Sequence, residues 1–107
     1  MRLLEQAVSR TDDNALMLCD LSAAYFARAA ARKDPADLLL ATAAAERATV
    51  AAPQRLEPRF NLALGLEKLH LDSAAGYAWR DYKRRDPHSG WGAEAQRRAL
   101  DLERPNT

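Results

Sequence analysis

The residues of this sequence that could attack a substrate or hold a metal ion are few, and they lie far apart along the chain. The single cysteine is Cys19, and the two histidines are His70 and His88. A catalytic thiol needs a neighbouring base and a third group that orients this base, and a zinc site needs closely spaced pairs of ligands. Neither spacing occurs here. We therefore expect no enzyme, no metal site and no cofactor, and we interpret Cys19 as a small apolar residue.

A basic cluster in the second half of the chain could contact phosphate groups. It consists of Arg80, Lys83, Arg84 and Arg85. Asp81 and Asp86 interrupt the cluster, however, and cations are favoured at the C-terminal end of a helix in any case. Sixteen Lys and Arg residues against fifteen Asp and Glu residues give a net charge of +1, which provides no general attraction to nucleic acid or membrane. We therefore interpret the cluster as a solvated helix face and expect a partner that is a protein or a peptide.

The composition indicates a small all-α domain. The 107 residues are 48% hydrophobic but only 7% aromatic. The apolar residues are mainly Ala and Leu, which favour helices. A single cysteine excludes an internal disulfide bond, which fits a reducing cytoplasm. Residues 1–6 are too charged for a signal peptide, and no stretch approaches the roughly 20 apolar residues that cross a bilayer. The expectation is a cytoplasmic chain without membrane contacts.

Two prolines mark an internal repeat. Pro53 and Pro87 are 34 residues apart, and each follows an apolar-periodic segment that is typical of a helix. Counting back from them pairs Leu21, Ser22, Tyr25, Ala41, Ala45 and Ala48 of the first unit with Leu62, Ala63, Leu66, Ala75, Trp79 and Tyr82 of the second. The first unit has seven more residues around positions 28–37, so an enlarged turn is expected, with Pro35 or Ala36 at the start of the next helix.

The pattern predicts helices near residues 15–31, 36–51, 57–70, 73–85 and 90–103. Asp72 or Ser73 is expected to cap the fourth of these. Before the first predicted helix, Leu3, Leu4, Ala7 and Val8 form a short apolar stripe. Residues 11–14, which follow the stripe, are expected to cap the helix near residues 15–31. One domain over residues 1–107 is therefore expected to comprise part of a preceding unit (1–14), unit one (15–53), unit two (54–87), a final helix (88–103) and a tail (104–107).

Helix positions also predict which large side chains are buried. Trp79 and Tyr82 face the neighbouring helix and are expected to belong to the core. Trp91 is expected to pack onto them, and the alternative is an exposed docking aromatic. Gly65 lies inside a helix, where it costs about 1 kcal/mol relative to Ala. A close approach by a neighbour or a ligand would explain it.

The two units resemble the tetratricopeptide repeat (TPR) family, whose 34-residue helix pairs stack into a right-handed solenoid. In the second unit the signature positions hold Asn61, Leu62, Ala63, Leu66, Ala75, Trp79, Tyr82 and Pro87, although Arg59 stands where a large apolar residue is usual. In the first they hold Leu18, Leu21, Ser22, Tyr25, Ala41, Ala45, Ala48 and Pro53, and the long turn departs from the pattern. The resemblance implies an all-α, TPR-like solenoid fragment of helical hairpins with a C-terminal capping helix.

In this family the first helix of each pair lines a concave face that binds a protein partner. The resemblance places nine residues there: Leu16, Cys19, Ala23, Phe26, Glu57, Phe60, Leu64, Glu67 and Lys68. Such a groove suits an amphipathic helix or an extended peptide, held by Phe26 and Phe60 and oriented by Glu67 and Lys68. Packing on a missing repeat or on another domain is equally open. Acidic chaperone tails are disfavoured, because family members that bind them have Lys or Asn where this chain has Cys19, Ala23 and Phe60.

Two further functions stay open. The run from Trp79 to Trp91 is similar to helical-repeat regions that accompany CHAT-type caspase-like peptidase domains in bacterial proteins. That similarity implies a non-catalytic regulatory or structural segment of a larger enzyme. Alternatively, the stripe of Leu3, Leu4, Ala7 and Val8 has no partner helix before it and could form a homo-oligomer.

Overall fold

The computed structural model describes the backbone of residues 2–104 and the side chains of residues 14–104, and within this part of the chain every regular element is a helix. The elements are α1 (Arg2–Arg32), α2 (Pro35–Ala51), α3 (Leu56–Lys68), α4 (Asp72–Arg85) and α5 (Gly90–Glu103). This confirms the all-α fold class.

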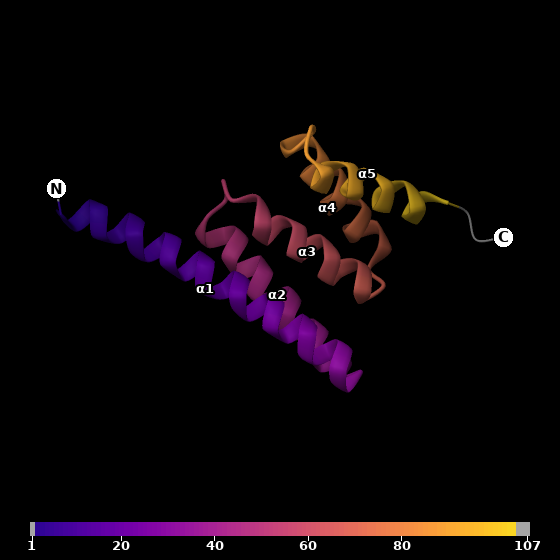
Figure 1. Ribbon diagram of the computed structural model, residues 1–107, viewed down its shortest axis with the longest axis horizontal. Helices are drawn as coiled ribbons and strands as arrows, with labels where there is room; N and C mark the ends of the chain where they lie inside the picture. The colour runs from indigo at the N-terminus through magenta and orange to yellow at the C-terminus, as the bar shows by residue number, and fades with distance from the viewer. Residues whose placement is uncertain (1, 105–107) are drawn as a thin grey trace.

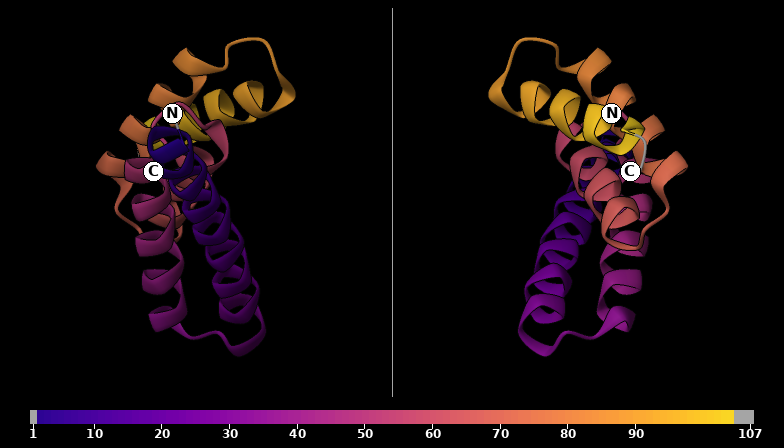
Figure 2. Two further views of the ribbon diagram at one scale, coloured as in Figure 1. Left: turned by 90° about the vertical axis from the view of Figure 1, so that its left-hand side faces the viewer. Right: turned by 90° about the vertical axis from the view of Figure 1, so that its right-hand side faces the viewer.

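Consecutive helices pack against each other as hairpins: α1 on α2, α2 on α3, α3 on α4 and α4 on α5, with α1 also touching α3. In the side views, α1 and α5 lie on one side of the molecule, and α2 and α4 lie on the other (Figure 2).

The first helix is longer than the sequence indicates. A helix break was predicted at residues 11–14, but α1 runs without interruption through this segment from Arg2 to Arg32. No Gly or Pro occurs before Pro35, and extending a formed helix costs less than nucleating a new one. With a rise of about 1.5 Å per residue, α1 is roughly 46 Å long, so its N-terminal part extends beyond α2 (Figure 1). The side chains of Leu3, Leu4, Ala7 and Val8 lie outside the described residues.

The predicted enlarged turn in the first unit is also wrong. The additional residues lengthen both helices, and only Lys33 and Asp34 lie between α1 and α2. Pro35 begins α2 as expected, and the Asp34 carboxylate caps this helix by accepting a hydrogen bond of 3.0 Å from the Ala36 N–H. Arg28, one turn before the end of α1, donates two hydrogen bonds to the buried carboxylate of Asp37, at 3.0 and 2.7 Å. This pair joins the extended helix ends.

The turn between α3 and α4 closes through backbone hydrogen bonds. The His70 N–H bonds to the Glu67 carbonyl at 2.9 Å, the Leu71 N–H bonds to the Leu66 carbonyl at 3.0 Å, and His70 has a positive φ of 61°. This is a Schellman closure. The backbone N-cap of α4 is Leu71, which makes no side-chain capping bond, so the predicted cap at Asp72 or Ser73 is wrong.

Buried positions repeat between the two helix pairs. Ser22 and Ala41 of the first pair are fully buried, and so are their counterparts Ala63 and Ala75 of the second. The Ser22 hydroxyl donates a 2.8 Å hydrogen bond to the Ala41 carbonyl, which ties α1 directly to the backbone of α2. Small side chains at these four positions allow the paired helices to approach closely.

The two pairs differ in how their second helices fill the core. Ala45 and Ala48 of α2 are fully buried, and their counterparts Trp79 and Tyr82 of α4 are also buried. Trp79 and Tyr82 form a core cluster with Ala63, Ala75, Ala95 and Ala99. The prediction that both aromatic residues belong to the core is confirmed.

Gly65 marks a point where α3 lies against the Thr42 side chain of α2. A Cβ atom at Gly65 would lie 2.1 Å from Thr42 Oγ1 and 2.9 Å from Thr42 Cβ. The close approach expected from a mid-helix glycine is therefore confirmed, and the neighbour is a helix of the same chain.

We expect Gly65→Ala to destabilise the protein by about 1–3 kcal/mol, because the overlap with Thr42 outweighs the better helix propensity of Ala. Urea unfolding measures this cost. Gly76→Ala is the matched control within α4, since its Cβ would meet only Arg80 Nη1 at 3.4 Å; it should stabilise by about 0.5–1 kcal/mol. Equal effects of the two substitutions would contradict the packing, as would a Thr42→Ala background that fails to reduce the cost of Gly65→Ala.

Candidate functional site

The nine residues predicted to line a binding face differ in how much of each side chain reaches solvent. On α1, Leu16 is 42% exposed and Ala23 is also exposed, whereas Phe26 is half-buried and Cys19 is buried. On α3, Glu57 and Lys68 are exposed, and the half-buried residues are Phe60, Leu64 and Glu67. We call this set, together with Trp91 of α5, the α1–α3–α5 face.

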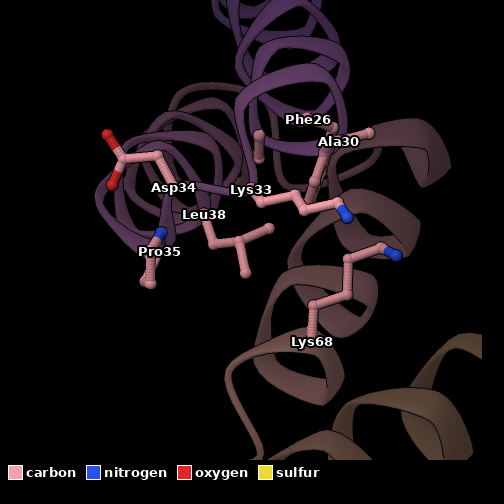
Figure 3. A pocket seen from close by; sticks show the side chains of 8 residues that line it. Phe26, Ala30, Lys33, Asp34, Pro35, Leu38 and Lys68 are labelled. Atoms are coloured by element: carbon pink, nitrogen blue, oxygen red, sulfur yellow. The ribbon is translucent and has the colours of Figure 1, made fainter.

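The first hollow on this face has a volume of about 360 Å3 and lies where α1, α2 and α3 meet. Phe26, Ala29, Ala30 and Leu38 give it apolar walls; Lys33, Asp34, Pro35 and Lys68 complete it. Figure 3 shows the Lys33 and Lys68 side chains projecting on the same side of the hollow, while the Asp34 carboxylate points away from them. Phe26 of α1 and Lys68 of α3 were both predicted to line the binding face, and the structure places them around one hollow.

Four aromatic rings gather at the other end of the face, and Phe60 is their centre. Its ring meets those of Trp79, Tyr82 and Trp91 edge to face, with centroid distances of 4.8, 5.3 and 5.1 Å. Such pairs contribute roughly 0.5–1.5 kcal/mol each beyond the area they bury. Phe60 therefore stabilises the fold as well as lining the face.

The expected core position of Trp91 is wrong, because this residue is 63% exposed. The buried stripe of α5 consists of Gly92, Ala95 and Ala99. Trp91 precedes this stripe by one residue, which turns it by about 100° around the helix axis. It consequently touches the edge of the aromatic cluster through Phe60 and leaves much of its indole in solvent.

A second hollow opens between α3, the end of α4 and α5. Its narrower part, about 170 Å3, is lined by Glu57, Phe60, Asn61, Tyr82 and Trp91. An adjoining open part of about 470 Å3 is lined by Phe60, Leu64, Gly90, Trp91, Glu94 and Arg98. We call both parts together the aromatic hollow. The contribution of Glu94 and Arg98 was missed from the sequence because the final helix was interpreted as a cap, and an exposed Trp91 was only the alternative to its expected core position.

Glu67 was expected to orient a partner, but its carboxylate is occupied within the chain. One oxygen accepts a 3.0 Å hydrogen bond from the indole N–H of Trp79, and the other accepts a 2.7 Å hydrogen bond from Arg98. Arg98 also bonds to Glu94 at 2.8 Å, and its guanidinium lies 5.4 Å from the Trp79 ring centroid. Glu67 therefore links α3, α4 and α5 and satisfies the one polar atom of a fully buried tryptophan.

Comparison with known proteins adds no family: no protein-family model, curated protein or solved structure matches this chain. The geometry of the face is therefore the basis for any function assigned to it.

Cys19 is buried and forms no disulfide bond. Burial raises the pKa of its thiol above the ordinary value, and the negative charge of Glu57 adds to this effect. The thiolate is the nucleophilic form of cysteine, so a raised pKa disfavours nucleophilic chemistry at this residue. In the part of the chain with described side chains, no cluster of three or more His, Cys, Asp or Glu residues is arranged to hold a metal ion.

None of the helices among the described residues combines the length and the apolar composition needed to cross a bilayer.

Tyr82 gives the aromatic cluster a measurable pH dependence. Burial raises its pKa from 10.0 to about 12, and the hydrogen bond from its hydroxyl to Asp86, 2.9 Å long, adds to the shift. Because the folded state holds this proton more tightly than the unfolded state does, the associated stability is complete below pH 10 and is lost as the pH rises towards 12.

We therefore expect the free energy of unfolding to fall by about 2–3 kcal/mol between these pH values on account of Tyr82. Urea unfolding at a series of pH values measures the fall, and Tyr82→Phe is the control that lacks the ionisable group. If Tyr82→Phe lost as much free energy of unfolding at alkaline pH as the wild type, Tyr82 would not ionise in the expected range.

Proposed function

We propose that this chain is a TPR-like fragment that binds a peptide, a helix or a neighbouring domain on the α1–α3–α5 face. The repeat itself supports this proposal, because positions 34 or 41 residues apart are buried in the same way in the two helix pairs, as for Ala41 and Ala75 or Ser22 and Ala63. Stacked helix pairs with one shared side are the arrangement that helical-repeat proteins use for binding.

The observation that carries the proposal is the combination of hollows and exposed apolar side chains on one face. Leu16 and Trp91 expose 42% and 63% of their surface. Phe26 and Phe60 line hollows at the two ends. Aromatic residues that stand beside a hollow are the usual anchors of protein interfaces, because a partner can bury them at small entropic cost.

A second surface supports the alternatives that the sequence left open. Between α1 and α2, a hollow of about 570 Å3 is lined in part by Leu18, Ala43 and Val50. Val50 is 76% exposed. A preceding repeat, a domain of a larger enzyme such as a CHAT-type peptidase, or a second copy would cover these residues. Light scattering distinguishes the last case, and a monomer at high concentration would exclude self-association.

The proposal is tested with peptides selected from a random phage-displayed library on the immobilised chain, whose affinities are then measured by fluorescence anisotropy. Ala23→Arg places a large cation on the α1–α3–α5 face and should weaken binding about tenfold or more. Ala43→Arg is the matched control, since it makes the same change at an exposed alanine of α2. The proposal is wrong if Ala43→Arg weakens binding and Ala23→Arg does not, or if no peptide is selected. Circular dichroism confirms that both variants fold.

A further inference from the structure

The chemistry of the aromatic hollow identifies what kind of partner fits it. We propose that this hollow holds a basic side chain of the partner, Lys or Arg, with its cation beside the Glu57 carboxylate and its aliphatic stem against Phe60 and Trp91. This inference rests on the proposed binding function and specifies the partner for one end of the α1–α3–α5 face.

The aromatic rings of the hollow favour a cation. Phe60 and Trp91 meet at a centroid distance of 5.1 Å and an interplanar angle of 77°, so they form an aromatic corner at the hollow. Tyr82 and Asn61 also line the narrow part. The face of an aromatic ring carries negative electrostatic potential and attracts a cation, most strongly in Trp. Lys and Arg also have long apolar stems that cover apolar surface while the charge stays near water.

The charged groups of the hollow also favour a cation. Glu57 lines the narrow part of the hollow. It has no hydrogen-bond or ion-pair partner among the residues whose side chains are described. The other charged groups of the lining are Glu94 and Arg98. Arg98 is held by Glu67 and Glu94 at 2.7 and 2.8 Å, so its charge is already compensated. The charge left for a partner is therefore negative.

Other classes of side chain fit the hollow less well. An acidic side chain would face Glu57 and be repelled. A purely apolar side chain would cover Glu57 without pairing it, and covering an unpaired carboxylate is unfavourable. The same chain already places guanidinium groups over aromatic rings, since Arg28 lies 5.1 Å from the centroid of Tyr25 and Arg98 lies 5.4 Å from that of Trp79. A basic side chain is the occupant that uses both the rings and the free carboxylate.

The experiment uses the peptides selected on the wild-type chain. We expect them to share a Lys or Arg, and we expect replacing this residue by norleucine, which keeps the stem but removes the charge, to weaken binding roughly five- to thirtyfold. Glu57→Gln should weaken binding of the original peptide by a similar factor, and in this variant the norleucine replacement should weaken binding less than in the wild type, because only the attraction of the cation to the aromatic rings is then lost. Trp91→Ala should also weaken binding.

Two matched controls isolate the hollow. Tyr77→Ala removes an aromatic side chain of α4 that is 66% exposed, much like Trp91, and Glu46→Gln removes a carboxylate of α2; both should leave the affinity unchanged. The inference is overturned if the selected peptides lack a basic residue, or if norleucine weakens binding to Glu57→Gln as much as to the wild type. If such peptides still depend on Ala23, the proposed function holds and only the basic partner is wrong. If no peptide is selected, both fail.

Discussion

Trp79→Ala is expected to reduce the free energy of unfolding by about 3–5 kcal/mol, a large part of the stability of a domain of this size. Trp79 is fully buried, touches Phe60 and donates its indole N–H to Glu67. The substitution leaves a cavity where α3 meets α4 and a half-buried carboxylate without one of its two donors. Urea unfolding followed by circular dichroism measures the loss, or shows that the variant is already unfolded in water.

The second tryptophan is the control. Trp91→Ala removes a side chain that is 63% exposed and whose ring contact is with Phe60, so it should cost about 1 kcal/mol or less. The contrast tests the corrected position of Trp91, because the sequence alone placed both residues in the core. Similar costs for the two substitutions would show that Trp91 is buried after all.

Gly92→Ala is expected to cost about 3 kcal/mol, since a Cβ atom at this position would lie 1.8 Å from the backbone carbonyl oxygen of Asp86. The loop cannot easily move away. Asp86 accepts hydrogen bonds from Tyr82 and Ser89, at 2.9 and 2.5 Å, and the Ser89 hydroxyl caps α5 by accepting from the Gly92 N–H at 3.1 Å. Relieving the overlap would break some of these bonds.

Gly90→Ala, two residues earlier, is the comparison for this prediction. No atom lies within 4 Å of the position that its Cβ would occupy, and neither glycine has a positive φ. Gly90→Ala should therefore be neutral or slightly stabilising in thermal unfolding. A loss of stability as large as that of Gly92→Ala would mean that both glycines serve the backbone conformation of the loop and that the approach of Asp86 is not the cause.

The sequence predicted those parts of the fold that depend on short-range patterns. Pro35 at the start of α2, small residues at Ser22 and Ala63, and the burial of Trp79 follow from helix periodicity and from the repeat. The continuity of α1 was missed because residues with capping propensity also fit inside a helix when nothing breaks it. The enlarged turn was predicted wrongly because inserted residues can extend two helices as easily as a loop.

The site was less predictable, because it depends on contacts between residues far apart in the chain. Phe60 and Phe26 were placed at hollows, but nothing in the local pattern shows that Arg98 pairs with Glu67 across 31 residues. The exposure of Trp91 depends on the residue at which α5 begins, and a shift of one residue would exchange it with Gly92. Gly92 itself gave no signal, since its close contact is with the backbone of Asp86.

The most direct test of the binding face is chemical-shift mapping by two-dimensional 15N–1H NMR with a peptide selected on the wild-type chain. We expect the largest changes on Leu16, Ala23, Phe26 and Leu64 and on the indole N–H of Trp91, and little change on Tyr77 and Val50. Changes concentrated on Val50, Ala43 and Leu18 would contradict this expectation, because they would place the partner at the hollow between α1 and α2.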